Sequence, residues 1–361
     1  MNKEKGNYIR KFGFLRNFSI SLISIAIALF ISVFFVMWAK DYGFIASVKL
    51  LFTSIWKGSF GTKVNLVETL VFATPLIFTG LAHSVAFKTG LFNIGVEGQF
   101  IMGGTVSTLI ALIPGIPSPI HIIITLLGGI VAGVIWGGIP GYLKAKIGTN
   151  EVVNTIMMNF IALHLTNYLV MGPFHKPNSA STPLIQNSAT LYRFLGQSNR
   201  LNVGIFIGLA LVAVVYILLW KTTIGYEIRA VGFSPSSAEY GGISIKKNII
   251  LAMGISGALA GIGGAVHIMG VQHQAIQLGG FTGFGMDGIA VALVAKSNPV
   301  GVIFSAILFA ALNYSSGTLM LYGIPKTIVY LIQGIIILFI AGEYLFRKIA
   351  DRRKKGALIN E

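Results

Sequence analysis

The sequence predicts an all-α membrane protein of about ten spanning helices, and three observations support this fold class. The 361 residues are 54% hydrophobic and only 11% charged. A soluble domain carries about 25% charged residues, so this chain has too few to cover a water-facing surface. Long uncharged runs alternate with short basic clusters, which is typical of membrane spans and their flanking loops. A soluble enzyme, a disordered chain and a nucleic-acid-binding module are excluded, despite the net charge of +16.

A span is expected wherever about 20 mostly apolar residues follow one another. The first run is uncharged, follows a basic segment at residues 1–17, and is too long for a cleaved signal peptide. Together the spans form one membrane domain, residues 18–346, followed by a basic tail at 347–361. The expected spans are 18–39, 64–87, two within 89–143, 152–171, 201–220, 248–270, 281–295, 298–318 and 326–346.

Lysine and arginine are distributed unevenly between the two sides of this arrangement. If the N-terminus is cytoplasmic, most of the 27 basic residues fall in cytoplasmic segments. The positive-inside rule therefore predicts that both termini and the loop 221–247 lie in the cytoplasm. The segment between the first two spans, residues 40–63, is expected to be an outer loop although it holds four lysines.

The chain weakly matches itself when residues 80–98 are set against residues 270–288. Four glycines and one histidine coincide, and Glu97 falls on Asp287. The match pairs the second and third spans with the seventh and eighth, and these two pairs run in opposite directions. An inverted repeat of two five-helix halves, as in many transporters, is therefore expected. Glycines spaced four apart in the fourth and seventh spans predict close helix packing.

Charged and amide side chains in the predicted spans are the candidate functional residues. An acid at a helix centre costs about 2.5–3.5 kcal/mol on insertion scales, so Glu97 and Asp287 should avoid lipid. These acids either line a polar path or brace interrupted helices. The same alternatives, a path-facing role or a hydrogen bond between helices, apply to the amides. The candidates are Asn93, Glu97, Gln99, Asn154, Asn159 and Asp287. Asn150, in contrast, is expected to cap the fifth span.

The loop at 221–247 predicts a short docking helix on the cytoplasmic face. Ser234 and Pro235 can start such a helix, and the glycine pair beginning at Gly241 can end it. The segment brings no catalytic groups, so its expected role is contact with a partner, and the alternative is an ordinary connecting loop. The residues expected to couple to that partner are Arg229, Pro235, Ala238, Glu239 and Gly241.

Several kinds of chemistry have no signature in this sequence. Cysteine is absent, which excludes disulfides and thiolate ligands, and the six histidines show no metal-ligand spacing. A phosphate-binding loop for ATP and a hydrolase elbow are also missing. The chain is therefore expected to be neither an enzyme nor a metalloprotein, and to hold no cofactor.

Three segments, residues 90–99, 148–159 and 229–243, together resemble the permease subunit of a bacterial ABC importer. The wider family takes up ribose-type sugars and branched-chain amino acids, and this chain is most similar to the longer permease of nucleoside importers. The resemblance implies about ten spans and an ATP-binding subunit docked on the short cytoplasmic helix. It also implies a second, shorter permease and an extracytoplasmic substrate-binding lipoprotein, with ATP used only by the partner subunit.

The expected substrate is neutral, because the interior lacks a central lysine or arginine to bind an anion. The resemblance points to nucleosides, and a simple sugar of the ribose type is the alternative that this chain does not separate. A secondary transporter driven by protons or ions is the competing class, because intramembrane acids also suit a proton relay.

Overall fold

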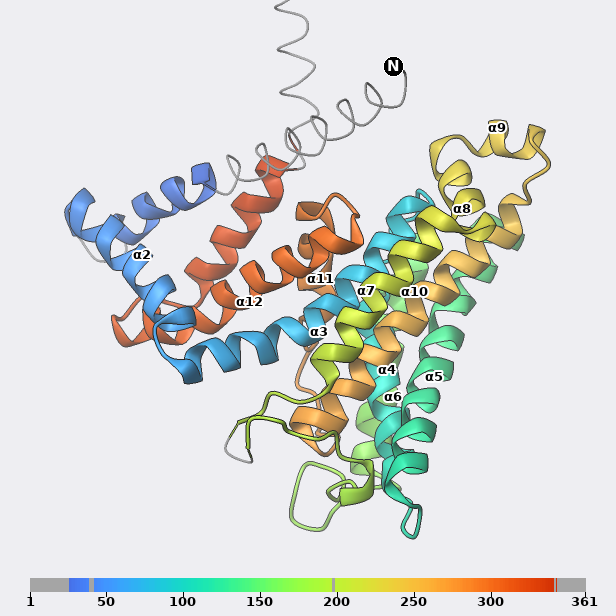
Figure 1. Ribbon diagram of the computed structural model, residues 1–361, viewed down its shortest axis with the longest axis horizontal. Coiled ribbons are helices and arrows are strands. Elements are labelled where there is room, and N and C mark those ends of the chain that lie inside the picture. Colours follow the sequence, from blue (N-terminus) through green and yellow to red (C-terminus); the bar gives the residue numbers. More distant parts are fainter. Residues whose placement is uncertain (1–25, 39–41, 197–198, 341, 343–361) are drawn as a thin grey trace, which may run out of the picture. The chain divides into compact units, whose positions relative to one another are not determined.

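The computed structural model describes residues 26–38, 42–196, 199–340 and 342 (Figure 1). Within these residues the chain is helical and forms no strand beyond one isolated bridge between Ser181 and Ile276. The expected basic ends, residues 1–17 and 347–361, lie outside the described residues. The labelled helices are α2 (Phe44–Phe60), α3 (Lys63–Lys88), α4 (Val96–Ala111), α5 (Ser118–Ile147), α6 (Glu151–Met171), α7 (Gly204–Lys221), α8 (Thr223–Phe233), α9 (Pro235–Tyr240), α10 (Ile245–His267), α11 (Phe284–Val294) and α12 (Pro299–Leu321).

The described residues divide into two compact units, one within residues 62–311 and one within residues 26–61 together with 312–342. Five helices in the described part are long and apolar enough to cross a membrane, and three more are apolar but shorter. The chain is therefore a multi-pass α-helical membrane protein. The five long helices are Lys63–Lys88, Ser118–Ile147, Gly204–Lys221, Ile245–Gln272 and Pro299–Leu321, and the shorter ones are Ala26–Trp38, Phe284–Val294 and Thr327–Ile340.

The larger unit is organised around α10, which packs along α5 and α4 (Figure 1). Glycines face each other across the α5–α10 contact, which we call the glycine seam. A Cβ atom on Gly257 would lie 2.1 Å from the carbonyl oxygen of Gly133, and one on Gly261 would lie 2.1 Å from that of Gly129. Only glycine permits this approach of the two backbones. The packing role expected from the glycine spacing is confirmed.

The segment expected as an outer loop, residues 40–63, instead contains the 17-residue helix α2. Its buried face is formed mostly of small polar residues: Ser47, Leu51, Ser54 and Gly58 follow one another at helical spacing. The lysines at positions 49 and 57 made the segment resemble a hydrated loop. The helix is amphipathic, with exposed apolar residues such as Ile45, Phe52 and Trp56, but the segment has no uncharged run of about 20 residues, so the prediction of a loop was wrong.

The loop expected at 221–247 is also more ordered than its sequence suggested. Helix α8 follows α7 after Thr222, whose side chain accepts a hydrogen bond from the Gly225 N–H, at 3.1 Å. The short helix predicted after Ser234 is confirmed as α9. Ser234 accepts from the Ser237 N–H at 3.4 Å, and Gly242 then takes the left-handed conformation at φ +78°.

Candidate functional site

Two helices of the larger unit begin inside the protein instead of at its ends. Helix α4 starts after the non-helical residues Gly90 to Gly95, and α11 starts after Gly283. Neither glycine has a side chain to cap the helix that follows. The first turn of any helix leaves backbone N–H groups without partners, and burying them unpaired is costly. Both starts therefore require hydrogen-bond acceptors from elsewhere in the fold.

Glu97, which lies in the first turn of α4, supplies the acceptors for α11. Its side chain is fully buried. One carboxylate oxygen accepts from the Thr282 hydroxyl at 2.6 Å and from the Gly283 N–H at 2.9 Å. The other accepts from the N–H groups of Gly285 at 2.7 Å and Met286 at 3.3 Å. A carboxylate at a helix N-terminus also interacts favourably with the helix dipole. Glu97 is thus the cap of α11, donated by another helix.

Asn159, on α6, has the same role for α4. Its side-chain oxygen accepts from the Gly98 N–H at 2.8 Å, and its amide donates to the Ile94 carbonyl at 3.0 Å. Asn159 is close to the middle of α6, so this contact lies deep in the protein. Helices α6, α4 and α11 are therefore linked in series, each capping the next. We call the contact of α4 and α11 at Glu97 the capped junction.

Asn93 and Gln99 complete a polar network at the start of α4. Their side-chain amides exchange two hydrogen bonds of 3.2 Å, and both residues are fully buried. Asn93 also donates to the Ser256 hydroxyl on α10, at 2.9 Å. Ser256 in turn donates to the Ala82 carbonyl of α3, also at 2.9 Å. The network thus fastens the non-helical segment before α4 to two long helices.

Sequence reasoning missed three members of this site, namely His83, Ser256 and Thr282. The Nε2 atom of His83 hydrogen-bonds to the Gly285 carbonyl at 2.9 Å, next to the Glu97 contacts. The weak self-match did place His83 and Gly285 within its matched segments. Ser256 and Thr282 carried no signal, because isolated hydroxyls are common in spans.

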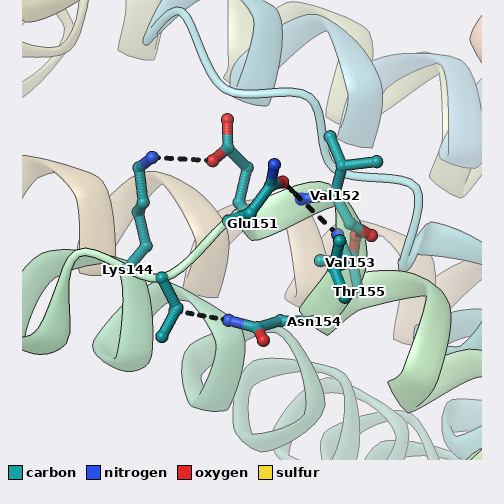
Figure 2. A network of polar contacts seen from close by, with 8 residues as sticks. Lys144, Glu151, Val152, Val153, Asn154 and Thr155 are labelled. Carbon is teal, nitrogen blue, oxygen red and sulfur yellow. Dashed lines mark hydrogen bonds and ion pairs between the residues drawn. The ribbon is translucent and has the colours of Figure 1, made fainter.

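Of the remaining two candidates, Asn154 lies away from the Glu97 contacts and Asp287 directly follows the backbone that Glu97 caps. Asn154 is half-buried near the start of α6 and donates to the Thr149 hydroxyl at 2.6 Å (Figure 2). Asn150 caps α6 as expected, accepting from the Val152 and Val153 N–H groups at 2.9 and 3.4 Å (Figure 2). Asp287 lies half-buried in the first turn of α11. Asn150 and Asn154 thus make local contacts, whereas Asn159 reaches Gly98 and Ile94, far earlier in the chain.

The short connection between α5 and α6 is held by an ion pair as well as by the Asn150 cap. Lys144, in the last turn of α5, lies 2.8 Å from the Glu151 carboxylate at the first position of α6 (Figure 2). Gly148, with φ +77°, ends α5 in the left-handed conformation. Only three residues separate the two helices. The ion pair therefore joins the end of α5 directly to the start of α6.

A small cavity lies beside the network, between α4, α6, α10 and the segment that leads to α11. Its volume is about 40 Å³, which leaves room for a few water molecules. Its lining has no Asp, Glu, Lys or Arg: Phe100, Ile101, Gly104, Thr105, Thr166, Gly264, His267, Ile268, Gln272, Ala275, Ile276, Leu278 and Thr282.

The expected coupling residues divide into an exposed set and an internal set. Pro235, Glu239 and Gly241 are exposed on α9 and at its end, whereas Ala238 is buried, with 4% of its surface exposed. Arg229 lies on α8 with its guanidinium 5.5 Å from the centre of the Trp220 ring. Two large side chains that the sequence reading passed over, Phe233 and Tyr240, are 90% and 95% exposed.

A multi-pass helical protein whose interrupted helices meet in a buried polar site has the architecture of a membrane transporter. The chain belongs to the family of permease components of branched-chain amino acid transport systems, whose model matches residues 65–341. This confirms the resemblance found in the sequence. As a permease component, the chain is a transport subunit and not itself an enzyme.

Individual relatives cover most of the chain. The guanosine ABC transporter permease of Bacillus subtilis is 39% identical over 316 residues, which cover 86% of this chain and 91% of the relative. The nucleoside ABC transporter permease of Lactococcus lactis is 36% identical, with 88% and 89% covered. The glucose ABC transporter permease of Haloferax volcanii is 31% identical, with 80% and 78% covered. No solved structure matches the chain significantly.

Proposed function

We propose that this chain is the membrane subunit of an ATP-driven importer that carries nucleosides into the cell. The observation that supports this substrate is the 39% identity to a guanosine permease over 86% of the chain, with a second nucleoside relative at 36%. A cavity lining without Asp, Glu, Lys or Arg suits a neutral substrate. The glucose relative at 31% identity makes a neutral sugar the second candidate.

Uptake of labelled guanosine, inosine and ribose tests this substrate. Cells that express the complete transporter should accumulate the nucleosides and lose this ability when the ATP-binding subunit is disabled. Uptake of ribose alone would overturn the nucleoside proposal and leave an importer of sugars. Nucleoside uptake that survives loss of the ATPase but collapses with a protonophore would place the chain in the ion-driven class instead.

The proposed topology has ten crossings in the bacterial cell membrane with both termini cytoplasmic. The helices Ala26–Trp38, α3, α4, α5, α6, α7, α10, α11, α12 and Thr327–Ile340 are the crossings. The chain has no cysteine, so single cysteines report on sidedness without background. Ser237→Cys on α9 should be shielded from an impermeant thiol reagent added outside, and Asn187→Cys should react. The opposite pattern would refute this topology.

The proposed inverted repeat pairs α3 and α4 with α10 and α11. In each pair, a long helix is followed by a non-helical segment and a helix that starts inside the protein. The self-match aligns Gly95, at the start of α4, with Gly285 in the first turn of α11. Under this proposal the capped junction is where the two halves of the repeat meet.

The proposed partners are an ATP-binding subunit, a second permease that forms a heterodimer with this one, and a substrate-binding lipoprotein. ATP is bound by the first of these and not by this chain. Helix α9 is the proposed contact with the ATPase, because Phe233 and Tyr240 expose large apolar rings beside it. Tyr240→Ala should reduce co-purification of the ATPase, while Tyr226→Ala, an exposed aromatic on α8, serves as the matched control. Equal loss in both variants would contradict this contact.

A further inference from the structure

Three aromatic rings from three helices converge at the cavity next to the capped junction. Phe100 comes from α4, His267 from α10, and Phe284 is the first residue of α11. Their ring centres lie 5.0 Å apart for His267 and Phe284, 5.4 Å for Phe100 and Phe284, and 5.9 Å for Phe100 and His267. These separations are within the range of stacked or edge-to-face aromatic pairs. Two of the three rings, Phe100 and His267, line the cavity directly.

The polar groups of the cavity are few and neutral in type. Hydroxyl and amide groups come from Thr105, Thr166, Gln272 and Thr282. The Nδ1 atom of His267 is buried and has no hydrogen-bond partner among the described residues. A buried ring nitrogen without a partner costs free energy that a ligand can recover by forming the bond. Flat rings, an unused ring nitrogen and neutral hydroxyls together favour a planar, neutral, heteroaromatic group.

We propose that this aromatic cavity receives the nucleobase of the substrate during transport, an inference that rests on the nucleoside proposal above. A base stacks on aromatic side chains whatever its identity. Its hydrogen-bonding edge offers both donors and acceptors, so it can pair with the free nitrogen of His267. A ribose unit presents hydroxyl groups but no ring face to stack, and the cavity therefore selects for the base. The sugar of the nucleoside then projects toward the threonine hydroxyls.

The cavity has to enlarge to admit a base, because about 40 Å³ accommodates only water. Helix α10 is fixed to α5 by the glycine seam, and α4 is fixed to α10 by backbone contact between Gly103 and Gly261. Neither α4 nor α10 is therefore expected to move when the cavity enlarges. The segment 275–282 is instead held largely by hydrogen bonds, among them those of Ala275 with Thr182 and of Thr282 with Glu97. Asn167 accepts from the Leu278 N–H at 2.7 Å and donates to the Leu278 carbonyl at 2.9 Å, and the Gln277 N–H donates to the Ala180 carbonyl at 2.8 Å. This segment is the wall that moves when the base enters.

Protection of a single cysteine tests the subsite directly. Ile276 lines the cavity and is 41% exposed, so Ile276→Cys should react with a charged methanethiosulfonate reagent. Leu184→Cys, exposed elsewhere among the residues that follow α6, is the matched control. In the complete transporter, reconstituted in nanodiscs, saturating guanosine should slow modification of Ile276→Cys several-fold. Ribose should leave both rates unchanged, and guanosine should leave the Leu184→Cys rate unchanged.

Ring-removing variants separate recognition from folding. Phe284→Leu keeps most of the volume but removes a stacking face, so protection should require about tenfold more guanosine. His267→Gln keeps a hydrogen-bonding group and should weaken protection less. Phe206→Leu, which removes a ring from the Phe194–Phe206 pair on another surface, should bind guanosine as the parent does. The elution profile of each complex establishes that it is assembled.

The outcomes distinguish the subsite from the function on which it rests. A complex that imports guanosine but shows no protection of Ile276→Cys would overturn the subsite and leave the nucleoside importer intact. Equal protection by guanosine and ribose would also overturn it, because the base would then not be what the cavity recognises. A complex that imports only ribose would instead refute the proposed substrate.

Discussion

The glycine seam and the capped junction hold helices of the larger unit together by different combinations of contacts. In the seam, α5 and α10 touch through backbone, and shape alone determines the contact. In the junction, α4 and α11 meet through one carboxylate that accepts four hydrogen bonds, and Gly285 also packs against the Glu97 backbone, where a Cβ atom would lie 2.4 Å from the Glu97 Cα atom. A close-packed backbone contact has no second arrangement available to it, whereas hydrogen bonds to a single side chain can be exchanged for others. The seam therefore depends on shape alone, and the junction depends on shape together with hydrogen bonds to one side chain.

The largest expected effect comes from breaking the seam. Gly257→Val would place a Cβ atom 2.1 Å from the Gly133 carbonyl oxygen, and backbone cannot yield as a side chain can. The two helices must separate, so we expect loss of most folded protein after detergent extraction. Gly254→Val, three residues earlier on α10, would meet only Val134 at 3.9 Å and is the matched control. Gel-filtration yield measures both, and normal yield of Gly257→Val would contradict the seam.

Breaking the junction should lower stability less than breaking the seam does, and its main effect should be a loss of uptake. Glu97→Gln replaces an acceptor by an amide that points donor hydrogens at the donors of α11. We expect a loss of about 2–4 kcal/mol and near-complete loss of uptake, because charge-assisted bonds are replaced by a mismatch. Thermal unfolding and uptake of the complex measure the two effects. Asp287→Asn, half-buried on α11, should change stability less, and an equal loss in both variants would contradict the special role of Glu97.

Removing the cap of α4 should have an intermediate effect. Asn159→Ala loses one bond to the Gly98 N–H and one to the Ile94 carbonyl, so we expect a cost of about 1–3 kcal/mol. Asn154→Ala loses a half-buried bond to Thr149 and should cost about 0.5–1 kcal/mol. Unfolding midpoints of the two variants in one detergent give the comparison. A larger loss for Asn154 would show that the α6–α4–α11 series is not what holds the junction.

The smallest effect concerns pH at the segment that leads into the junction. Burial, together with the neighbouring Arg193, lowers the pKa of His273 below its ordinary value of 6.5. The neutral form is therefore favoured in the folded state, where Arg193 donates to the His273 ring. The contribution to stability is complete above pH 6.5 and declines as the pH falls through the lowered pKa. His273→Gln should flatten the dependence of the melting temperature between pH 7.5 and about 5. An unchanged slope would contradict this assignment.

Local rules predicted the parts of the fold that local residues determine. The apolar runs located the long helices, Asn150 was recognised as a cap, and Ser234 with the Gly241–Gly242 pair located α9. Helix α2 was missed because Lys49 and Lys57 leave no uncharged run of about 20 residues, which is the pattern that predicts a span. Glu97 was recognised as unusual but its partner was not, because a cap supplied by another helix leaves no pattern in sequence. The partner is backbone, the N–H groups of Gly283 and Gly285 among others.

The cap that Glu97 provides has a consequence for how the chain is made. Thr282, the first of its partners, is synthesised 185 residues later. At 5–20 residues per second, the ribosome needs roughly 10–40 s to produce that partner. During this interval the Glu97 carboxylate, in the first turn of α4, lacks the four donors that it has in the folded protein, and a buried polar group without hydrogen bonds is costly. Helix α4 therefore reaches its final hydrogen bonding only after α11 has been translated.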